Sequence, residues 1–449
     1  MSLNDKPNLF CAYDGTMTKP YDPALEVVDL CRELIRIDSS NYGDDSGPGE
    51  RNVAEYIAEK LADVSIESEI YEASPKRSCL MARWGNQNSS KPGLLIHGHM
   101  DVVPAQAGDW QVDPFSGEVK DGYVWGRGAV DMKDFNAILL SVVRARQRAG
   151  QIPDRPITLI FTADEEAGSQ LGGHKLVTER REWFDGITEA VGEVGGFSTE
   201  INGQRLYLIE TGEKGIAWMK MTAKGRAGHG SMRHDDNAIN TLARAITTLG
   251  EHEWQVEPGP TMEALVAMVR ELTGNESLDL DEVLDVFGTS AKMISAGIRN
   301  TTNTTMLSAG YKHNVIPGLA EASVDGRYLP GQRETFVDEV RKVVGPDIEV
   351  ETLILENALE FPFSGDLVDA MVMALREEDP EAHIAPYLMS GGTDGKAWSR
   401  LNINSYGFTP LRLPSDLDFT ALFHGVDERV PVDALHFGTK VFDRFLDLV

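Results

Sequence analysis

Cysteine is scarce in this chain of 449 residues, which contains only Cys11, Cys31 and Cys79. The three lie far apart and form no Cys-x-x-Cys pair, so the sequence predicts neither a disulfide framework nor a cysteine metal site. So few isolated thiols are typical of a reducing compartment, and we expect the protein to be cytoplasmic.

Basic residues are also few, since 42 Lys and Arg oppose 71 Asp and Glu, a formal net charge of −29. This balance argues against nucleic acid and anionic membranes as partners, and most of it is typical of a solvated surface. No apolar run reaches the ~20 residues of a membrane span, and the first residues lack the basic-then-apolar pattern of a secretory signal. We therefore expect no membrane partner and no such signal.

What the chain does have is the composition of a globular protein, with 41% apolar and 25% charged residues. Its length favours two domains, or three. Helical spacing of apolar residues marks 23–37, 52–64 and 132–148, and two short apolar runs, 94–96 and 157–162, flank the last of these. Strand, helix and strand in that order predict a βαβ layer with helices over a parallel sheet.

The pattern changes between residues 213 and 353, where shorter elements are expected. Strand and helix patterns alternate there over four segments: 214–224, 237–249, 311–328 and 334–344. We predict an α/β fold in which residues 1–212 and 354–449 form an α/β/α domain with a central, mostly parallel sheet. Residues 213–353 are expected to form a smaller inserted α+β domain of the ferredoxin-like type.

Two histidines and an aspartate follow the apolar run 94–96. Residues two apart in an extended chain point to the same side, so His97, His99 and Asp101 can share one face. Asp101 is placed to hold the second ring nitrogen of a metal-bound His99, which fixes the tautomer. The same carboxylate is equally compatible with a solvated loop acid, and His-x-Asp alone is weak evidence for a metal.

Candidate carboxylates also stand beside the predicted helix 132–148 and the apolar run 157–162. Asp131 stands directly before a helix, where it is either an N-cap or a bridge between two cations. Asp164, Glu165 and Glu166 directly follow the run 157–162. Open α/β sheets place their ligands at that carboxyl end, so one acid can bind a metal while its neighbour takes a proton from water. A solvated, helix-capping loop is the alternative.

Glu193, in a glycine-rich apolar stretch, and His424, just before another acid, complete the set. Each is ordinary alone. Together the candidates are two histidines and three carboxylates, each after an apolar strand or at a glycine turn. This mixture of nitrogen and oxygen ligands suits a pair of zinc ions better than calcium or magnesium.

Eight short motifs, in order along nearly the whole chain, make the sequence resemble the dinuclear zinc aminoacylase and carboxypeptidase family. That family includes acetylornithine deacetylase, succinyl-diaminopimelate desuccinylase and carboxypeptidases G and S. The motifs are HGHMDVVP, GRGAVDMK, DEEAG, GEVGG, GHGS, NVIPG, SGGTDG and HGVDERV. Each motif is modest alone, but their order and spacing together are specific.

The resemblance implies cofactors of two Zn²⁺ per chain, with Co²⁺ or Mn²⁺ as substitutes. The implied ligands are His99 and Glu193 on one ion, Glu166 and His424 on the other, and Asp131 bridging both. The family pattern also makes Glu165 the general base, has Asp101 orient His99, and leaves His97 outside the ligand set. It further implies a cis peptide bond between Asp131 and Met132.

Under this resemblance the inserted domain serves as a lid and dimerisation unit. His229 matches a histidine that steadies the oxyanion, often in the active site of the partner subunit, so we expect a homodimer. Asn303 and Arg327 match residues that bind the acyl oxygen and free carboxylate of the substrate; a surface ion pair is the alternative for Arg327. Gly392 and Thr393 match a loop that closes over the substrate.

Two features depart from the family pattern. Lys396 stands where several relatives carry arginine, which leaves the side-chain selectivity there open. The segment 256–295 is longer than in compact relatives and has no assigned role.

These roles predict an enzyme that hydrolyses an amide bond in a small molecule, an N-acyl amino acid or a short peptide with a free carboxylate. A serine hydrolase is disfavoured at Ser231 because the GxSxG pattern is absent. A catalytically dead relative is disfavoured because Glu165 and all implied ligands are present. A dipeptidase or carboxypeptidase needs the same metals and carboxylate clamp, so deacylase and peptidase both stay open.

Overall fold

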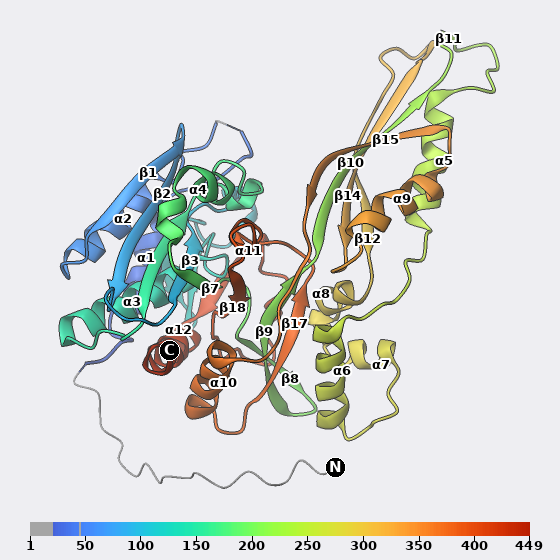
Figure 1. The fold of residues 1–449 in the computed structure, drawn as a ribbon. Coiled ribbons are helices and arrows are strands. Elements are labelled where there is room, and N and C mark those ends of the chain that lie inside the picture. Colours follow the sequence, from blue (N-terminus) through green and yellow to red (C-terminus); the bar gives the residue numbers. More distant parts are fainter. Residues whose placement is uncertain (1–20, 45) are drawn as a thin grey trace.

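The structure, a computed structural model, describes residues 21–44 and 46–449 and consists of a larger and a smaller lobe (Figure 1). Cys11, and the first residues on which the expectation about a secretory signal rests, lie outside the described residues. The chain first enters the smaller lobe near Glu213 and finally leaves it near Glu356.

A ten-stranded mixed sheet forms the centre of the larger lobe. Its strands are β1 (Ser68–Ser74), β2 (Arg77–Gly85), β3 (Gly93–His99), β6 (Pro156–Thr162), β7 (Ile187–Gly192), β8 (Phe197–Ile201), β9 (Gln204–Glu213), β16 (Leu359–Glu360), β17 (His383–Met389) and β18 (Asn404–Gly407). The order β6-β3-β7-β18 is parallel throughout. Toward one edge β6, β2 and β1 pair antiparallel, and on the other side β9 pairs antiparallel with β18, β8 and β16 and parallel with β17.

Helices cover both faces of this sheet because its strands are apolar on both sides. Leu94 and Ile96 of β3 point into one core, and Leu95 between them points into the other. The first core is shared with α1 (Val27–Arg36), α2 (Arg51–Ala62), α3 (Lys133–Ala149), α10 (Asp366–Glu378) and α12 (Val432–Leu448). The second is shared with α4 (Gly173–Glu179) and α11 (Gly395–Ser399).

The smaller lobe contains a four-stranded antiparallel sheet in the order β12-β14-β10-β15. Its elements, in chain order, are β10 (Gly215–Lys224), α5 (Ala238–Gly250), β12 (Thr301–Ala309), β14 (Leu319–Tyr328), α9 (Arg333–Val344) and β15 (Ile348–Glu356). This βαββαβ order is that of a ferredoxin-like unit, as expected. Two short strands, β11 (Gly228–His229) and β13 (Val315–Ile316), pair at its far end (Figure 1).

Three further helices lie between α5 and β12 in sequence: α6 (Pro260–Thr273), α7 (Leu280–Asp285) and α8 (Ala291–Ser295). They do not cover the four-stranded sheet. Their apolar side chains, Leu265 and Leu284 among them, belong to the same core as the large sheet, and α6 packs along β17 (Figure 1).

The expected α/β class is therefore confirmed, and most predicted helices and strands begin and end within a few residues of the observed ones. The exception is the pattern 311–328, in which the long strand β14 begins only at Leu319. The large sheet is more mixed than expected, because hairpins such as β1–β2 and β8–β9 add antiparallel strands around a parallel centre. Within the described residues, no helix combines the length and apolarity that crossing a bilayer requires.

Candidate metal centre

Three neighbouring parallel strands, β6, β3 and β7, end at the same edge of the large sheet. His99 is the last residue of β3, and Glu193 directly follows β7. Glu165 and Glu166 stand in a short 3-10 helix three residues after β6 ends. Parallel strands bring their carboxyl ends together, so these side chains meet although they are up to 94 residues apart in the sequence.

Asp131 and His424 are brought to this edge by a second, small sheet. Its strands are β4 (Glu118–Lys120), β5 (Tyr123–Trp125) and β19 (Arg429–Pro431). Antiparallel pairing of β5 with β19 places the loop after β5 beside the loop before β19. Glu428 locks the two loops together, because its buried carboxylate accepts hydrogen bonds from the backbone N–H groups of Gly128 and Val130 and pairs with Arg127 at 2.6 Å.

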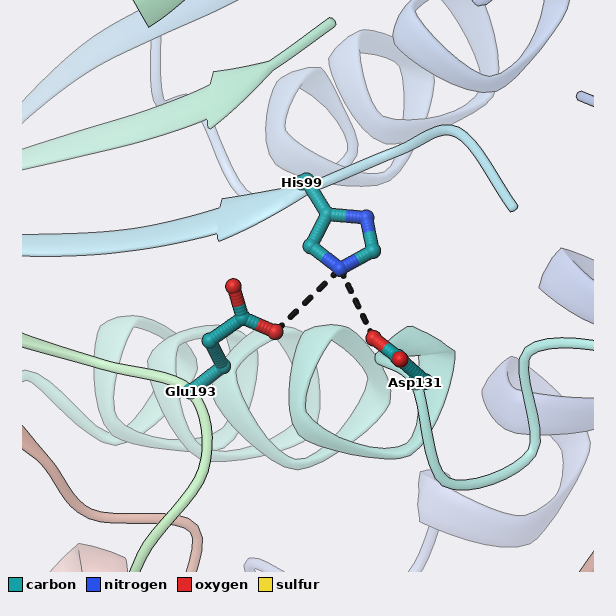
Figure 2. A group of neighbouring side chains, drawn as sticks. All are labelled: His99, Asp131 and Glu193. Carbon is teal, nitrogen blue, oxygen red and sulfur yellow. Dashed lines mark hydrogen bonds and ion pairs between the residues drawn. The ribbon is translucent and has the colours of Figure 1, made fainter. Parts of the chain in front are cut away.

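His99, Asp131 and Glu193 form one compact group (Figure 2). The Nε2 atom of His99 lies 2.9 Å from Oδ1 of Asp131 and 3.2 Å from Oε2 of Glu193. Its Nδ1 atom donates to the backbone carbonyl of Asp101 at 2.9 Å, which directs Nε2 into the group. One nitrogen and two carboxylate oxygens thus converge on one point.

Asp131, Glu166 and His424 form a second group that shares the aspartate. The Nε2 atom of His424 lies 3.3 Å from Oδ2 of Asp131 and 2.9 Å from Oε2 of Glu166. The two oxygens of Asp131 therefore serve different groups. In each group the ligand atoms lie within 4.8 Å of one another, close enough to surround a single ion.

The charges at both groups fit divalent cations. Burial raises the pKa of Glu166 and the pKa of Glu193 to about 7 each. The negative charge of Asp131 adds to the shift of Glu166. Hydrogen bonds to Asp131 and Glu166 raise the pKa of His424 to about 10. Oε1 of Glu166 is buried with no hydrogen-bond partner among the described atoms. Carboxylates that repel one another, an orphaned oxygen and two imidazoles are a donor set that suits zinc.

Glu165 belongs to neither metal group but faces both. Its Oε2 atom lies 4.0 Å from Nε2 of His99. It lines a cavity of about 270 Å³ together with metal-group residues and with Gly392 and Thr393 of the loop after β17. Burial and the charge of Glu193 raise its pKa well above the usual value. A carboxylate that is close to the candidate metals but outside the ligand groups is placed to exchange protons with a reacting molecule.

Asp101 supports this arrangement in a way that the spacing argument did not foresee. Its carboxylate is 3.7 Å from Nδ1 of His99, whereas its backbone carbonyl makes the short contact. The carboxylate oxygens accept hydrogen bonds from the backbone N–H groups of Glu165 and Glu166, each at 3.1 Å, and from the side chain of Asn41 at 2.9 Å. Asp101 thus positions the general-base candidate Glu165 and the candidate ligand Glu166 together.

His97 lies outside both groups, as the family pattern implies. Its ring is buried edge-on against Trp398, and burial lowers its pKa to about 3. A Cβ atom on Gly192 would approach that ring to 2.3 Å, so only glycine allows β7 to pass His97 before reaching Glu193. The expected cis peptide bond is present between Asp131 and Met132.

Three predicted site residues lie in the smaller lobe and do not line this cavity. His229 is exposed in β11, where Nδ1 contacts the hydroxyl of Ser231 at 2.8 Å. Asn303 is exposed in β12, and Arg327 in β14 forms a two-bond ion pair with Asp325 at 2.7 and 3.0 Å. Figure 1 shows β11 at the end of the smaller lobe that is farthest from β3 and β7.

Sequence reasoning missed Asn41, Glu428 and Met293, which help to build the site. Asn41 and Glu428 are buried and hold site loops by hydrogen bonds to groups distant in the sequence. Met293 lines the cavity. For Glu428 a signal existed, since the glycine-rich loop before Asp131 exposes backbone N–H groups that need acceptors. Asn41 and Met293 carry no local signal.

A mixed α/β fold with two histidine–carboxylate groups joined by one aspartate defines the class of dinuclear metallohydrolases. The chain belongs to Peptidase family M20/M25/M40, which residues 95–448 match, and it is a hydrolase of C–N bonds. It is 27% identical over 438 residues to an N-fatty-acyl-amino acid synthase/hydrolase of Xenopus tropicalis. The aligned region covers 91% of this chain and 83% of that protein.

Solved structures share the fold. An M20 family metallo-carboxypeptidase from Sulfolobus solfataricus has a TM-score of 0.71 at 18% identity, over 94% of this chain and 99% of that one. A Bacillus subtilis protein described as a dinuclear metal binding peptidase from the M20 family has a TM-score of 0.58 at 13% identity, over 95% and 99% of the two chains.

Proposed function

We propose that this protein is a zinc-dependent amidohydrolase that cleaves N-acyl amino acids, or short peptides, with a free carboxylate. The observation that carries the proposal is the pair of histidine–carboxylate groups that share Asp131, with Glu165 beside them in one cavity. The N-acyl substrate is favoured because the Xenopus relative is described by that substrate class.

Five side chains would hold the two ions: His99, Asp131, Glu166, Glu193 and His424. When bound, divalent ions polarise the carbonyl oxygen of the scissile amide and lower the pKa of the attacking water. Two divalent ions would bring four positive charges and the three carboxylates three negative ones, while the neutral imidazoles add none. The occupied site would therefore have one positive charge in excess. That residual charge favours an anionic transition state at the site.

Glu165 acts as general base and then as general acid. Its carboxylate takes a proton from the attacking water and passes it to the nitrogen of the leaving amine, so the proton balance of hydrolysis closes on one side chain. The backbone N–H of Glu165 is held by Asp101 at 3.1 Å, which keeps the short helix that carries the base in place. General acid–base catalysis of this kind contributes about 10²–10⁴-fold to the rate.

The loop after β17 supplies the near wall of the substrate site. The backbone N–H and hydroxyl of Thr393 both donate to Glu213, at 3.0 and 2.5 Å, which fixes the loop where the two lobes join. Asn303 and Arg327 would bind the acyl oxygen and the free carboxylate. Arg327 has to exchange its pairing with Asp325 for that role, and bidentate pairing suits a substrate carboxylate equally well.

The protein acts as a homodimer, with a second copy bound along β12. This strand pairs with β14 on one side only among the described strands, and its side chains from Asn303 to Ala309 are exposed. Met306 and Leu307 are 69% and 68% exposed, unusual for adjacent apolar residues on a free edge. A dimer would also bring His229 from one copy to the metal site of the other.

A reducing compartment such as the cytoplasm fits the thiols that the structure describes. Cys31 and Cys79 are both free and buried. Burial raises the pKa of each thiol, so both are held in the protonated, unreactive form.

Exchange of the base for its amide tests the proposal. Glu165→Gln keeps the shape of the side chain and the five ligands, so it should retain two metal ions per chain and lose at least about a hundredfold in kcat. Metal content is measured by elemental analysis, and hydrolysis with N-acetyl amino acids and dipeptides. Near-full hydrolysis by the variant, or fewer than two ions per wild-type chain at saturation, would contradict the assignment.

An exopeptidase that cleaves peptides is the second candidate, favoured by the fold shared with the Sulfolobus carboxypeptidase. The same screen separates the two, because a deacylase prefers N-acyl amino acids and an exopeptidase prefers dipeptides of the same residue. Arg327→Ala should lower kcat/KM for substrates with a free carboxylate more than for their amides. Equal losses for both would assign Arg327 a purely structural role.

A further inference from the structure

The segment that forms α6, α7 and α8 belongs, by packing, to the lobe that holds the metal centre. Met262 and Leu265 of α6 and Ile294 of α8 are buried in the core of the large sheet. The start of α6 is pinned there, because the backbone N–H of Thr261 donates to Glu360 at 3.0 Å. Helix α8 is therefore held at a fixed place relative to the candidate metal ligands.

One residue of this segment, Met293 of α8, lines the cavity that contains the metal groups. Three other apolar side chains line the same cavity: Val194, Met389 and Phe423. Met293 and Phe423 are half-buried, so each presents apolar surface to the cavity. The cavity is thus lined both by metal-group residues and by four apolar side chains, and α8 contributes one of these four.

Contacts with other parts of the chain hold the three residues that line the cavity with Met293. Met389 ends β17 and is buried, and its carbonyl accepts from the backbone N–H of Lys214 at 2.9 Å. Phe423 packs edge-on against Phe419 with ring centres 5.2 Å apart. The carbonyl of Val194 accepts from a buried tyrosine hydroxyl at 2.9 Å. A methionine against such walls can adapt its unbranched side chain to the shape of a bound group.

The charges of the lining residues indicate which kind of substrate group can bind against Met293. Among the described residues that line the cavity, the ionisable side chains are carboxylates and one histidine, and none is Lys or Arg. A substrate chain that ended in a second carboxylate would find no Lys or Arg among these lining side chains and would be desolvated beside Met293 without a partner. An uncharged apolar chain buries its surface there with no such cost.

We propose that Met293, with Val194, Met389 and Phe423, forms an apolar subsite that selects substrates with an uncharged aliphatic chain beside the scissile amide. The inserted helix α8 is thereby a specificity-determining element. This proposal refines the proposed function and rests on it, because it takes the cleaved bond to be an amide. The aliphatic chain belongs either to the acyl group or to the amino-acid side chain, and the experiment has one arm for each.

The first arm measures kcat/KM of the metal-loaded full chain for N-acyl alanines from acetyl to hexanoyl. The second uses N-acetyl amino acids with side chains from methyl to butyl. In one arm kcat/KM should rise about fourfold for each methylene buried. Met293→Lys should flatten that rise, and Met293→Leu should keep it. A flat profile in both arms, or an unchanged rise in Met293→Lys, would overturn the subsite.

Two controls use neighbouring positions. Lys292 is the residue before Met293 in α8 but lines a different hollow with Ser295 and Arg299, so Lys292→Ala should leave the profile unchanged. Met373 is 49% exposed on α10, so Met373→Lys tests the effect of the same substitution away from the cavity. If Met293→Lys fails to fold, the milder Met293→Thr replaces it, and thermal unfolding checks each variant.

Binding without turnover separates the subsite from the proposed function. Straight-chain carboxylates from acetate to hexanoate are titrated calorimetrically into the metal-loaded wild type and Met293→Lys. If the wild type cleaves no amide in either arm but its affinity rises with chain length and that rise depends on Met293, the proposed function falls and the subsite stands. If amides are cleaved while neither kcat/KM nor affinity follows chain length, the subsite falls alone.

Discussion

Asp101 serves the site through its backbone and its side chain at once. The carbonyl orients the ring of His99, while the carboxylate oxygens accept from the N–H groups of Glu165 and Glu166 and from Asn41. A carboxylate, which only accepts, suits this place because its three hydrogen-bond partners are all donors.

Asp101→Asn tests this reading because it replaces one acceptor with an NH₂ group of the same size. One backbone N–H at the short helix then faces a donor and loses its hydrogen bond. We expect activity or metal affinity to fall about 10–100-fold, as for other residues that hold a ligand in place. The measurement is kcat with metal content at saturating zinc. If both stayed at wild-type values, Asp101 would have no positioning role.

His174 provides a pH prediction away from the metal groups. It is buried next to Glu356, whose Oε1 lies 3.8 Å from Nε2, and it faces Arg400 and Lys396. Burial, followed by the charge of Arg400, lowers its pKa from 6.5 to about 4. The unfolded chain therefore binds a proton on this histidine between pH 6.5 and 4 that the folded chain does not bind.

Stability should thus fall as the pH drops through this window, and the His174 contribution should be fully present above pH 6.5. His174→Gln removes the titration, so its loss of unfolding free energy between pH 7 and 4.5 should be smaller than that of the wild type by about 2 kcal/mol. Urea unfolding of both proteins at the two pH values gives the double difference. Parallel losses in the two proteins would contradict the prediction.

At the scale of elements, α11 joins the two lobes through Lys396. Its Nζ atom pairs with Glu213 at 3.0 Å and donates to the backbone carbonyls of Lys214 at 2.8 Å and Asn357 at 3.1 Å. Those carbonyls belong to the places where the chain first enters and finally leaves the smaller lobe. Lys396 is buried. It departs from the arginine of several relatives, and in this structure it connects both of these places to α11.

Lys396→Met keeps the length of the stem and removes the charge. Glu213 then stays buried without its cation, and we expect a loss of about 3 kcal/mol of unfolding free energy. Thr393 of the loop after β17 also donates a hydrogen bond to Glu213, so kcat should fall as well. Arg400→Met is the matched control, since that residue pairs with Glu356 at the surface and should cost less than about 1 kcal/mol. Equal losses in the two variants would refute the bridging role.

The elements also show what periodicity can and cannot predict. Helix α3 and strands β3 and β6 follow from local apolar spacing, and the edge where parallel strands end predicted that His99 lies near Glu165. The insertion of β18 between β7 and β9 could not be predicted, because strand order depends on pairings between residues about 200 apart. The packing of α8 beside the cavity is hidden for the same reason.

At the scale of the whole molecule, the three predicted site residues of the smaller lobe do not line the cavity of their own chain. His229 is exposed in β11, at the end of that lobe farthest from β3 and β7 (Figure 1). A histidine that steadies an oxyanion has to lie within hydrogen-bond reach of it. The arrangement therefore favours a site completed by a second copy of the chain, the copy we place along β12.

Mixing two inactive variants tests that completion directly. His229→Ala keeps the base but lacks the histidine, and Glu165→Gln keeps the histidine but lacks the base. If His229 acts across the dimer, a mixed dimer has one site with an intact Glu165 and the partner's intact His229. Refolding the two chains together at equal amounts makes half of the dimers mixed, so activity should recover to about a quarter of wild type. If His229 acted within its own chain, every site in the mixture would lack one group and activity would stay at the level of the single variants. A Leu307→Asp version of both chains, which places a charge on the β12 edge, is the control: it should abolish the recovery and elute as a monomer in size-exclusion chromatography with light scattering.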